Sequence, residues 1–414
     1  GYTFHTTCDT EVIIQLYDEY GTDCVKHLRG MFAFALWDKR RQRLLLARDR
    51  VGQKPLFYLL TKTFLAFASE MKSLLEDPAY QRELNLTALY HYLTYQYIPP
   101  PETIFQHIRK LPPAHILMYE HGTTTIEQYW NLRYVPKQPL DEHECLEETT
   151  TRLQESVKMR MLSDVPIGTF LSGGIDSSLV VAMMSRYTDH PLKTFSIGFQ
   201  EKQFNELPYA RLIAERYRTE HHEWIVEPDA VEVLPKLIWH FDEPFADPAA
   251  IPTYYLAKMT ARHVKVALNG DGGDESFAGY RRYLGHRRAQ YFSLLPLSLR
   301  RAVLAPWLNM MTEKRGHGST AALLNYLSFL NTLSLQSKEQ RYVRGMSIYD
   351  DQSKFNLLSD DVRCQLQQLN SQEYTYQYFR SNNAHHFTDK MLYADVMAYL
   401  PGALLVKIDR MTMA

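Results

Sequence analysis

Two short polar stretches, SGGIDSS (172–178) and NGDGGDES (269–276), contain the residue types that hold phosphate groups. Glycine lets backbone N–H groups approach an anion closely, and serine hydroxyls donate hydrogen bonds to it. A helix that begins in such a turn adds the partial positive charge of its N-terminus. The first stretch therefore predicts a turn shaped for a phosphate or pyrophosphate. It is not a Walker loop, because no Gly-Lys-Ser/Thr sequence follows.

Carboxylates in the same turns predict a metal ion. Asp176 lies in the first turn, and Asp271 and Asp274 lie in the second. Carboxylates that face phosphates would repel them unless a cation lies between, and Mg²⁺ takes one or two carboxylates together with phosphate oxygens. The alternative is that these acids only cap helices. Two such turns, each with acids and each after an apolar run, favour a site for a nucleotide with Mg²⁺.

The elements around these turns predict a doubly wound parallel sheet. From about residue 140, short strand-like runs alternate with helical patterns, and the strands are VPIGTFL, KTFSIGF, HHEWIV and VKVAL. Ligands bind beyond the carboxyl ends of parallel strands, so we expect both turns to line one crevice. A helix is expected over 141–161, and the chain after about residue 285 reads as mostly helical.

The first part of the chain predicts an antiparallel, β-rich unit. A helix is expected from Asp9, as its N-cap, to a stop at Gly21. Three hairpins are expected, in GMFAFALWD with RLLLARDR, in KPLFYLL with TFLAFAS, and in HILMYEHGTTTIEQYW. The proline-rich stretch 95–105 reads as a linker. A chain of 414 residues favours two domains.

Composition excludes several protein classes. With 46 basic and 47 acidic residues, the formal charge of -1 argues against a nucleic-acid partner. No apolar run approaches the roughly 18 residues that span a bilayer, so we expect no membrane association. The four cysteines form no CxxC pair, which favours reduced thiols in a cytoplasmic protein. The chain begins with Gly1 and not with Met, and we expect an internal fragment of a longer protein.

Several motifs resemble one family. SGGIDSS is similar to the pyrophosphate-loop signature of ATP pyrophosphatases. Three further motifs follow it in the order found in the glutamine-hydrolysing asparagine synthetases: DEPFADPAAIPTYYL, NGDGGDESFAGYRRY and YLPGALLVKIDRMTMA. CDTEVI, GMFAFALWD, LARDRVGQKPLFY and FASEMKSLL resemble the later part of that family's glutaminase domain. The resemblance implies part of an antiparallel glutaminase domain of the N-terminal nucleophile type, with its linker, over 1–135. It implies a parallel-sheet synthetase domain with a helical C-terminal part, truncated at its C-terminus, over 136–414.

The resemblance implies a ligase that makes asparagine. ATP activates aspartate, or a similar carboxylate, as an acyl-adenylate and releases pyrophosphate. Ammonia from glutamine then attacks the acyl carbon. The expected small molecules are ATP, Mg²⁺, glutamine and aspartate, and a homodimer is possible in such a family. Three alternatives stay open: amidation of another carboxylate, a cyclase of the β-lactam synthetase type, and a non-catalytic relative that binds ATP.

The resemblance also assigns residues. Asp271 takes the acidic position tied to adenylate formation, Asp9 faces glutamine, and Asp176 and Asp274 hold the metal. The ATP site is expected to comprise Leu171, Ser172, Gly173, Gly174, Asp176, Ser177, Ser178, Ile197, Asn269 and Gly270. Asn269 stands where the family has serine.

Other departures concern the two catalytic ends of the family. The N-terminal cysteine nucleophile and a late catalytic lysine are missing, so we expect this stretch to be inactive with glutamine. We interpret Cys8 as a neutral replacement of serine and not as a relocated nucleophile. Lys407 is interpreted as a structural residue.

Three further features remain to be interpreted. Arg281 or Arg282 could bind a substrate carboxylate, or both could lie on a solvated helix face. Asp242 and Asp247 could lie at the rim of the crevice or cap a loop. In EHHE (220–223), adjacent histidines point to opposite faces of a strand, which favours a structural role over a metal site.

Overall fold

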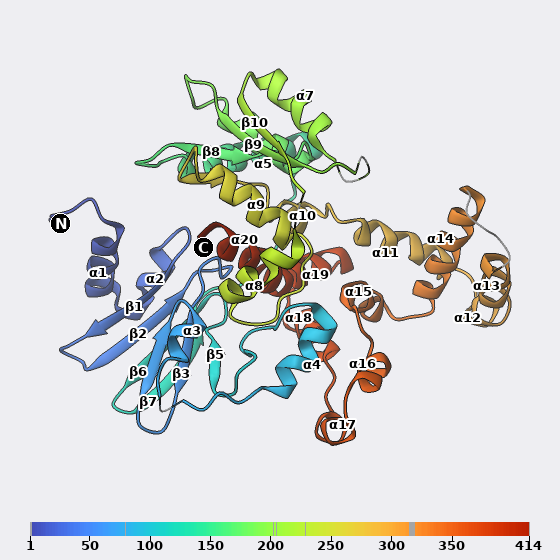
Figure 1. Ribbon diagram of the computed structural model, residues 1–414, viewed down its shortest axis with the longest axis horizontal. Coiled ribbons are helices and arrows are strands. Elements are labelled where there is room, and N and C mark those ends of the chain that lie inside the picture. The colour runs from blue at the N-terminus through green and yellow to red at the C-terminus, as the bar shows by residue number, and fades with distance from the viewer. Residues whose placement is uncertain are drawn as a thin grey trace.

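The computed structural model describes residues 2–78, 80–201, 203, 205–227, 229–313 and 319–413. Figure 1 shows a β-rich N-terminal unit in blue and cyan, a parallel sheet in green, and helices in yellow to red. Helix α20 (Leu405–Met413) lies between the N-terminal unit and the parallel sheet. The two units are therefore joined through the C-terminal helix as well as through the chain segment 129–141. The stretch 95–105, which was expected to be a linker, lies within the N-terminal unit, because the strands over 108–128 that follow it belong to the sheets of that unit.

The N-terminal unit consists of two antiparallel sheets, with strand orders β1-β2-β6-β7 and β4-β3-β5. All three predicted hairpins are confirmed, because β1 pairs with β2, β3 with β4 and β6 with β7. Leu45 and Leu46 of β2 are fully buried on opposite faces of the first sheet, in different core clusters. The strands are β1 (Ala33–Asp38), β2 (Arg43–Arg48), β3 (Phe57–Leu60), β4 (Leu65–Ala68), β5 (Ile108–Lys110), β6 (His115–Glu120) and β7 (Thr123–Gln128).

The predicted first helix forms, but its start differs from the expectation. Helix α1 (Asp9–Tyr20) has Cys8, not Asp9, at its N-cap, and the Cys8 side chain makes no capping hydrogen bond. Asp9 is instead the first helical residue, where a carboxylate still faces the positive end of the helix dipole. Gly21 ends the helix with φ +59°, as predicted. The other helical pieces of this unit are η1 (Gly21–Asp23), α2 (Cys24–His27), α3 (Met71–Leu74) and α4 (Leu86–Tyr95).

The second unit contains the predicted parallel sheet, in the order β10-β9-β8-β11. All three pairings are parallel. Crossover helices contribute a core in which Val181, Met184 and Ala210 are buried. The elements are α5 (Glu142–Arg160), β8 (Ile167–Phe170), α6 (Ile175–Met184), β9 (Lys193–Gly198), α7 (Leu207–Tyr217), β10 (Glu220–Ile225), α8 (Ala230–Phe241), α9 (Ala250–Thr260) and β11 (Val266–Leu268). Because β8 and β11 are neighbours, the turns that follow them lie at the same edge.

The rest of the described chain is helical, as expected. Tyr342, Val343, Phe379 and Met391 form a buried core between these helices. Helices α11 to α14 extend away from the sheets in Figure 1. The elements are α10 (Gly273–Phe277), α11 (Arg281–Phe292), α12 (Leu297–Leu299), η3 (Arg300–Leu304), α13 (Ala305–Glu313), α14 (Ser319–Ser334), α15 (Lys338–Met346), α16 (Asp351–Leu357), α17 (Asp360–Leu366), α18 (Gln372–Ser381), α19 (Phe387–Ala394), η4 (Asp395–Leu404) and α20.

One apolar run is longer than the sequence suggested. The continuous helical segment Phe387–Met413 has the length and composition to cross a bilayer, although 72% of its apolar window is buried inside the protein. The expectation of no such run was wrong. Asp395 and Lys407 interrupt the apolar residues, but the mean hydropathy of the segment stays high enough for a membrane span. Its burial is that of a core helix.

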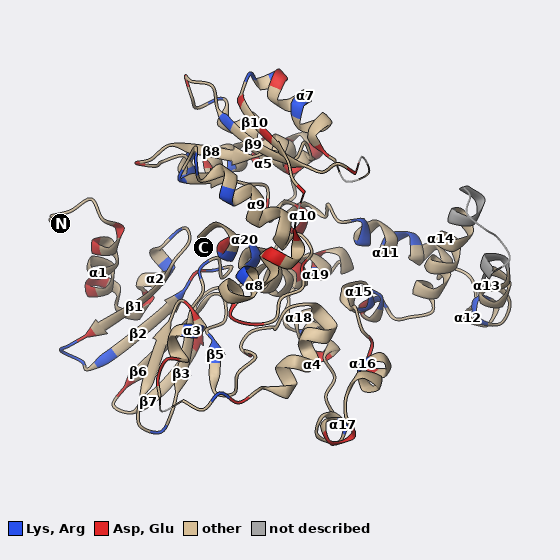
Figure 2. Cartoon of the chain, viewed as in Figure 1, with Lys and Arg blue, Asp and Glu red and all other residues tan. Residues whose placement is uncertain are grey.

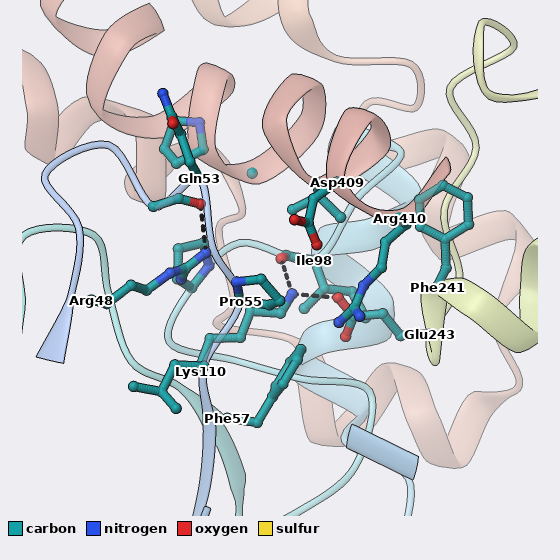
Figure 3. Close-up of a pocket in the computed structure, with 16 residues that line it drawn as sticks. Arg48, Gln53, Pro55, Phe57, Ile98, Lys110, Phe241, Glu243, Asp409 and Arg410 are labelled. Carbon is teal, nitrogen blue, oxygen red and sulfur yellow. Dashed lines mark hydrogen bonds and ion pairs between the residues drawn. The ribbon is translucent and has the colours of Figure 1, made fainter. Parts of the chain in front are cut away.

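Charged side chains bridge the two units. Lys54 contacts Asp409 of α20 at 2.9 Å, Lys72 contacts Asp242 at 3.0 Å, and the Arg410 guanidinium donates to the Ser69 carbonyl at 3.2 Å. Lys110 pairs with Glu243 in a small cavity whose walls come from both units, and it also donates to the Ile98 carbonyl (Figure 3).

Candidate functional site

The first turn follows β8 and begins α6. Gly173 has φ +81°, and a Cβ atom there would lie 2.5 Å from the backbone of Tyr209, so the position requires glycine. The hydroxyl oxygens of Ser172 and Ser177 lie 3.0 Å apart, and the Gly174 N–H donates to Ser172 Oγ at 3.2 Å. Gly174 is the N-cap of α6. The turn thus brings hydroxyl groups and the positive end of a helix to one place.

The second turn follows β11 and begins α10. Gly272 has φ +92°, which favours glycine. The Asn269 amide donates to Asp271 Oδ2 at 2.8 Å, and the Asp271 N–H donates to Asn269 Oδ1 at 3.2 Å. Asn269, which replaces the expected serine, therefore fixes the orientation of the Asp271 carboxylate.

The two turns lie in contact. A Cβ atom on Gly273 would be 2.5 Å from the carboxyl carbon of Asp176, and one on Gly270 would be 2.9 Å from the Asp176 Cβ. Glycine at both positions allows this approach. Both turns line one crevice, together with Ile197 of β9 and the C-terminal residues Leu404 and Ile408.

Most of the predicted site residues line this crevice. They are Leu171, Ser172, Gly174, Asp176, Ser177, Ile197, Asn269, Gly270, Asp271 and Asp274. Gly173 shapes the first turn from behind, and Ser178 is the next residue of α6. Asp9 lies apart from the crevice, exposed at the start of α1 in the other unit.

Acidic groups dominate the electrostatics of the crevice. Burial and the nearby Asp274 raise the pKa of Asp176. Burial also raises the pKa of Asp271, against the opposing effect of Lys407. The Lys407 ammonium is itself held by Asp247 at 2.9 Å. Figure 2 shows the acidic residues around α10, between the parallel sheet and α20. The carboxylates together would favour a bound cation.

The residues present fit a nucleotide with Mg²⁺. Ser178 Oγ is buried and has no hydrogen-bond partner among the described residues, so the first turn has an unused hydroxyl group. The metal-binding groups on offer are carboxylate oxygens, which suit Mg²⁺ and leave its other positions to phosphate oxygens and water. Mg²⁺ binds oxygen ligands, so the site requires no histidine or cysteine ligand.

Several open interpretations are resolved by contacts. The Arg282 guanidinium contacts Asp395 at 2.5 Å, inside the helical region, while Arg281 is exposed. Asp242 accepts from the Met71 N–H at 2.8 Å at the interface of the units, so it does not lie at the crevice rim. Asp247 combines a loop role with its Lys407 contact, because it also accepts from the Ala249 N–H at 2.8 Å.

The EHHE histidines make separate contacts. His221 Nδ1 lies 2.8 Å from Thr194 Oγ1, and His222 stacks on Phe195 with ring centroids 5.4 Å apart.

Sequence reasoning missed Glu275, Tyr280 and the Lys407–Asp247 pair. Only the position of Glu275 beside Asp274 could have drawn attention to it.

Comparisons with known proteins match both units. A family model described as asparagine synthase matches residues 148–414, and one described as glutamine amidotransferase domain matches residues 1–130. A Bacillus subtilis protein named asparagine synthetase [glutamine-hydrolyzing] 1 is 36% identical over 417 residues, which cover 100% of this chain and 63% of that protein. Another from the same organism, asparagine synthetase [glutamine-hydrolyzing] 3, is 32% identical over 68% of this chain and 48% of its own length. The chain thus spans at most about two thirds of these relatives.

Proposed function

Because this chain belongs to the asparagine synthase family, we propose that its crevice binds ATP with Mg²⁺ and activates a carboxylate as an adenylate. The full reaction would use aspartate and glutamine and form asparagine, glutamate, AMP and pyrophosphate. Under this proposal, residues 136–414 carry the synthetase chemistry and residues 1–135 belong to the glutaminase part.

The observation that carries the proposal is the contact between the two turns. Gly270 and Gly273 of the second turn lie against Asp176 of the first. This brings Asp176 and Asp274 to the same wall as the hydroxyl groups of the first turn. A pyrophosphate leaving group gains negative charge as its bond to the α-phosphorus breaks, and such an arrangement stabilises that charge.

Each group has a proposed task. Ser172, Gly174 and Ser177 would donate hydrogen bonds to phosphate oxygens, and Leu171 and Ile197 would contact the apolar base. Asp176 and Asp274 would hold Mg²⁺, which supplies charge neutralisation on the phosphates when bound. A substrate carboxylate oxygen attacks the α-phosphorus, pyrophosphate leaves, and Asp271, oriented by Asn269, faces the reacting centre. Ammonia then displaces AMP from the acyl carbon and loses a proton.

The N-terminal unit would bind glutamine, but we expect this chain to release no ammonia from it. Asp9, exposed at the start of α1, is the proposed glutamine contact. No nucleophilic cysteine is assigned to this chain. The four cysteines form no disulfide, which agrees with the proposed cytoplasmic location.

The products of ATP cleavage test the proposal. The protein is supplied with ATP, Mg²⁺ and aspartate, with ammonium or glutamine as the nitrogen source, and nucleotides are separated by chromatography. We expect AMP and pyrophosphate whose formation depends on aspartate. Release of ADP and phosphate would contradict the adenylate mechanism. Replacement of aspartate by other carboxylates in parallel assays shows which one is amidated.

A further inference from the structure

Glu275 is a buried carboxylate in the wall of the crevice with one oxygen unused. Its side chain lines the crevice from α10, next to Asp274, and the residue is only 1% exposed. Oε1 accepts a hydrogen bond from the Tyr280 hydroxyl. Oε2 is buried and has no hydrogen-bond partner among the described residues.

The basic groups nearest to this wall have other partners. Arg282 stacks on the Tyr280 ring at 3.9 Å, but its guanidinium contacts Asp395, which also accepts from the Tyr283 and Tyr342 hydroxyls. Lys407, on the C-terminal side of the crevice, is held by Asp247. In the part of the chain that the structure describes, no ion pair involves Glu275.

Neither protonation state satisfies Oε2 within the described protein. If the carboxyl is ionised, Oε2 lacks a hydrogen-bond donor. If it is protonated on Oε2, the new hydroxyl lacks an acceptor. Buried polar groups almost always have a partner, and an unpaired one costs free energy. The missing partner can come from a ligand in the crevice.

We propose that Glu275 receives a protonated nitrogen of a ligand bound in this crevice. Within the proposed function, on which this inference rests, the source is the α-ammonium of the amino acid whose side-chain carboxylate is activated; free ammonium is the second source. Aspartate carries two carboxylates that the crevice acids repel, and its ammonium is the one group complementary to Glu275. Glu275 thereby selects α-amino dicarboxylates over dicarboxylates without an amine.

The test compares aspartate with succinate, which has the same two carboxylates and lacks the amine. The 414-residue protein is first titrated with α,β-methylene-ATP and Mg²⁺ in a calorimeter, since this analogue cannot release pyrophosphate. The loaded protein is then titrated with aspartate, with succinate, and with succinate in the presence of ammonium chloride. A charge-assisted hydrogen bond predicts that wild type binds aspartate at least about 10-fold more tightly than succinate.

Three variants locate the preference. In Glu275→Gln we expect aspartate and succinate to bind with similar affinity. Glu275→Asp keeps the negative charge but shortens the side chain by one methylene group, which moves the carboxylate away from the ligand. We therefore expect an intermediate preference for aspartate. Glu215→Gln makes the same chemical change at an exposed position of α7 and should keep the full preference. Thermal unfolding confirms that each variant is folded, and the wild-type comparison stands independently of the variants.

The outcomes separate this inference from the proposed function. No binding of the nucleotide analogue would overturn the proposed function, and the inference with it. Nucleotide binding without a preference for aspartate in wild type, or with the full preference kept in Glu275→Gln, would overturn the inference alone. If ammonium chloride restores tight succinate binding in wild type and not in Glu275→Gln, the site is confirmed and also accepts free ammonium.

Discussion

The interface between the two units and the crevice both bury charge, but they handle it in opposite ways. At the interface, the Lys110 ammonium pairs with Glu243, and Lys54 pairs with Asp409. In the crevice, Asp176 and Asp274 lie close together, and neither forms an ion pair within the described chain. Paired charge fixes how the units meet, whereas unpaired charge of one sign favours a cationic ligand.

This comparison separates residues that stabilise from residues that bind. Burial raises the pKa of Glu243 and lowers that of Lys110, so each charge remains only because its partner offsets the desolvation. Removing one member of such a pair leaves the other charge buried without a partner. Removing one carboxylate from a cluster of like charges relieves repulsion instead. Substitutions in the two regions should therefore differ in what they change.

The largest loss of stability is expected at the interface. Glu243→Leu leaves the Lys110 ammonium buried without its counter-charge, and breaking such a pair costs about 3–5 kcal/mol of unfolding free energy. Urea unfolding followed by circular dichroism measures this. The double variant Lys110→Met/Glu243→Leu removes both charges and should recover most of the loss. A single variant as stable as wild type would show that the pair is not coupled to folding.

A buried histidine outside the crevice sharpens the comparison. His286 is nearly fully buried, stacks on Phe387 at 4.6 Å, and has no hydrogen-bond partner on either ring nitrogen among the described residues. Burial, with Arg341 and Lys338 nearby, lowers its pKa from 6.5 to about 4. An unpartnered ring is tolerated here because it stays neutral.

The pH dependence follows from this lowered pKa. The unfolded chain takes up the proton first, so the contribution of neutral His286 is complete above pH 6.5 and is lost as pH falls through about 4. The difference is up to about 3 kcal/mol. His286→Phe should remove that part of the acid sensitivity, while the lowered pKa of His91 contributes equally in both proteins. Parallel losses of stability in wild type and variant between pH 7 and 4 would contradict the assignment.

A smaller loss is expected at the edge of the interface. Lys54 is 31% exposed at its side chain, and its contact with Asp409 is partly screened by water. Lys54→Met should therefore lower the unfolding free energy by about 1–2 kcal/mol. The same urea titration measures it. A loss as large as that of Glu243→Leu would show that the contribution of these ion pairs to the unfolding free energy does not depend on their solvent exposure.

Local sequence patterns predicted much of the fold and most of the crevice wall. Glycine-rich sequences after apolar runs predicted both turns. The rule that ligands bind at the carboxyl ends of parallel strands predicted that Asp176 and Asp274 lie in one crevice. Turn residues between apolar runs also predicted the three hairpins of the N-terminal unit. These features depend on residues close in sequence or on a general rule of topology.

The paired charges could not be predicted in this way. Lys110 and Glu243 are 133 residues apart, and Arg282 and Asp395 are 113 apart. Nothing in the local pattern distinguishes such residues from solvated ones, because their partners are chosen by the packing of whole units. Glu275 could not be singled out for the same reason. Its Oε2 has no hydrogen-bond partner among the described residues, and only the three-dimensional structure reveals this.

The most direct test of the account is Mg²⁺-dependent ATP binding by wild type, Asp176→Asn and Asp274→Asn, measured side by side by calorimetry. We expect each variant to lose at least about 100-fold in Mg²⁺-dependent affinity or activity. We also expect its unfolding free energy to equal or exceed that of wild type, because a repulsive carboxylate has been neutralised. Variants that unfold more easily yet bind Mg²⁺–ATP as wild type does would contradict the account, because these acids would then stabilise the fold and bind no metal.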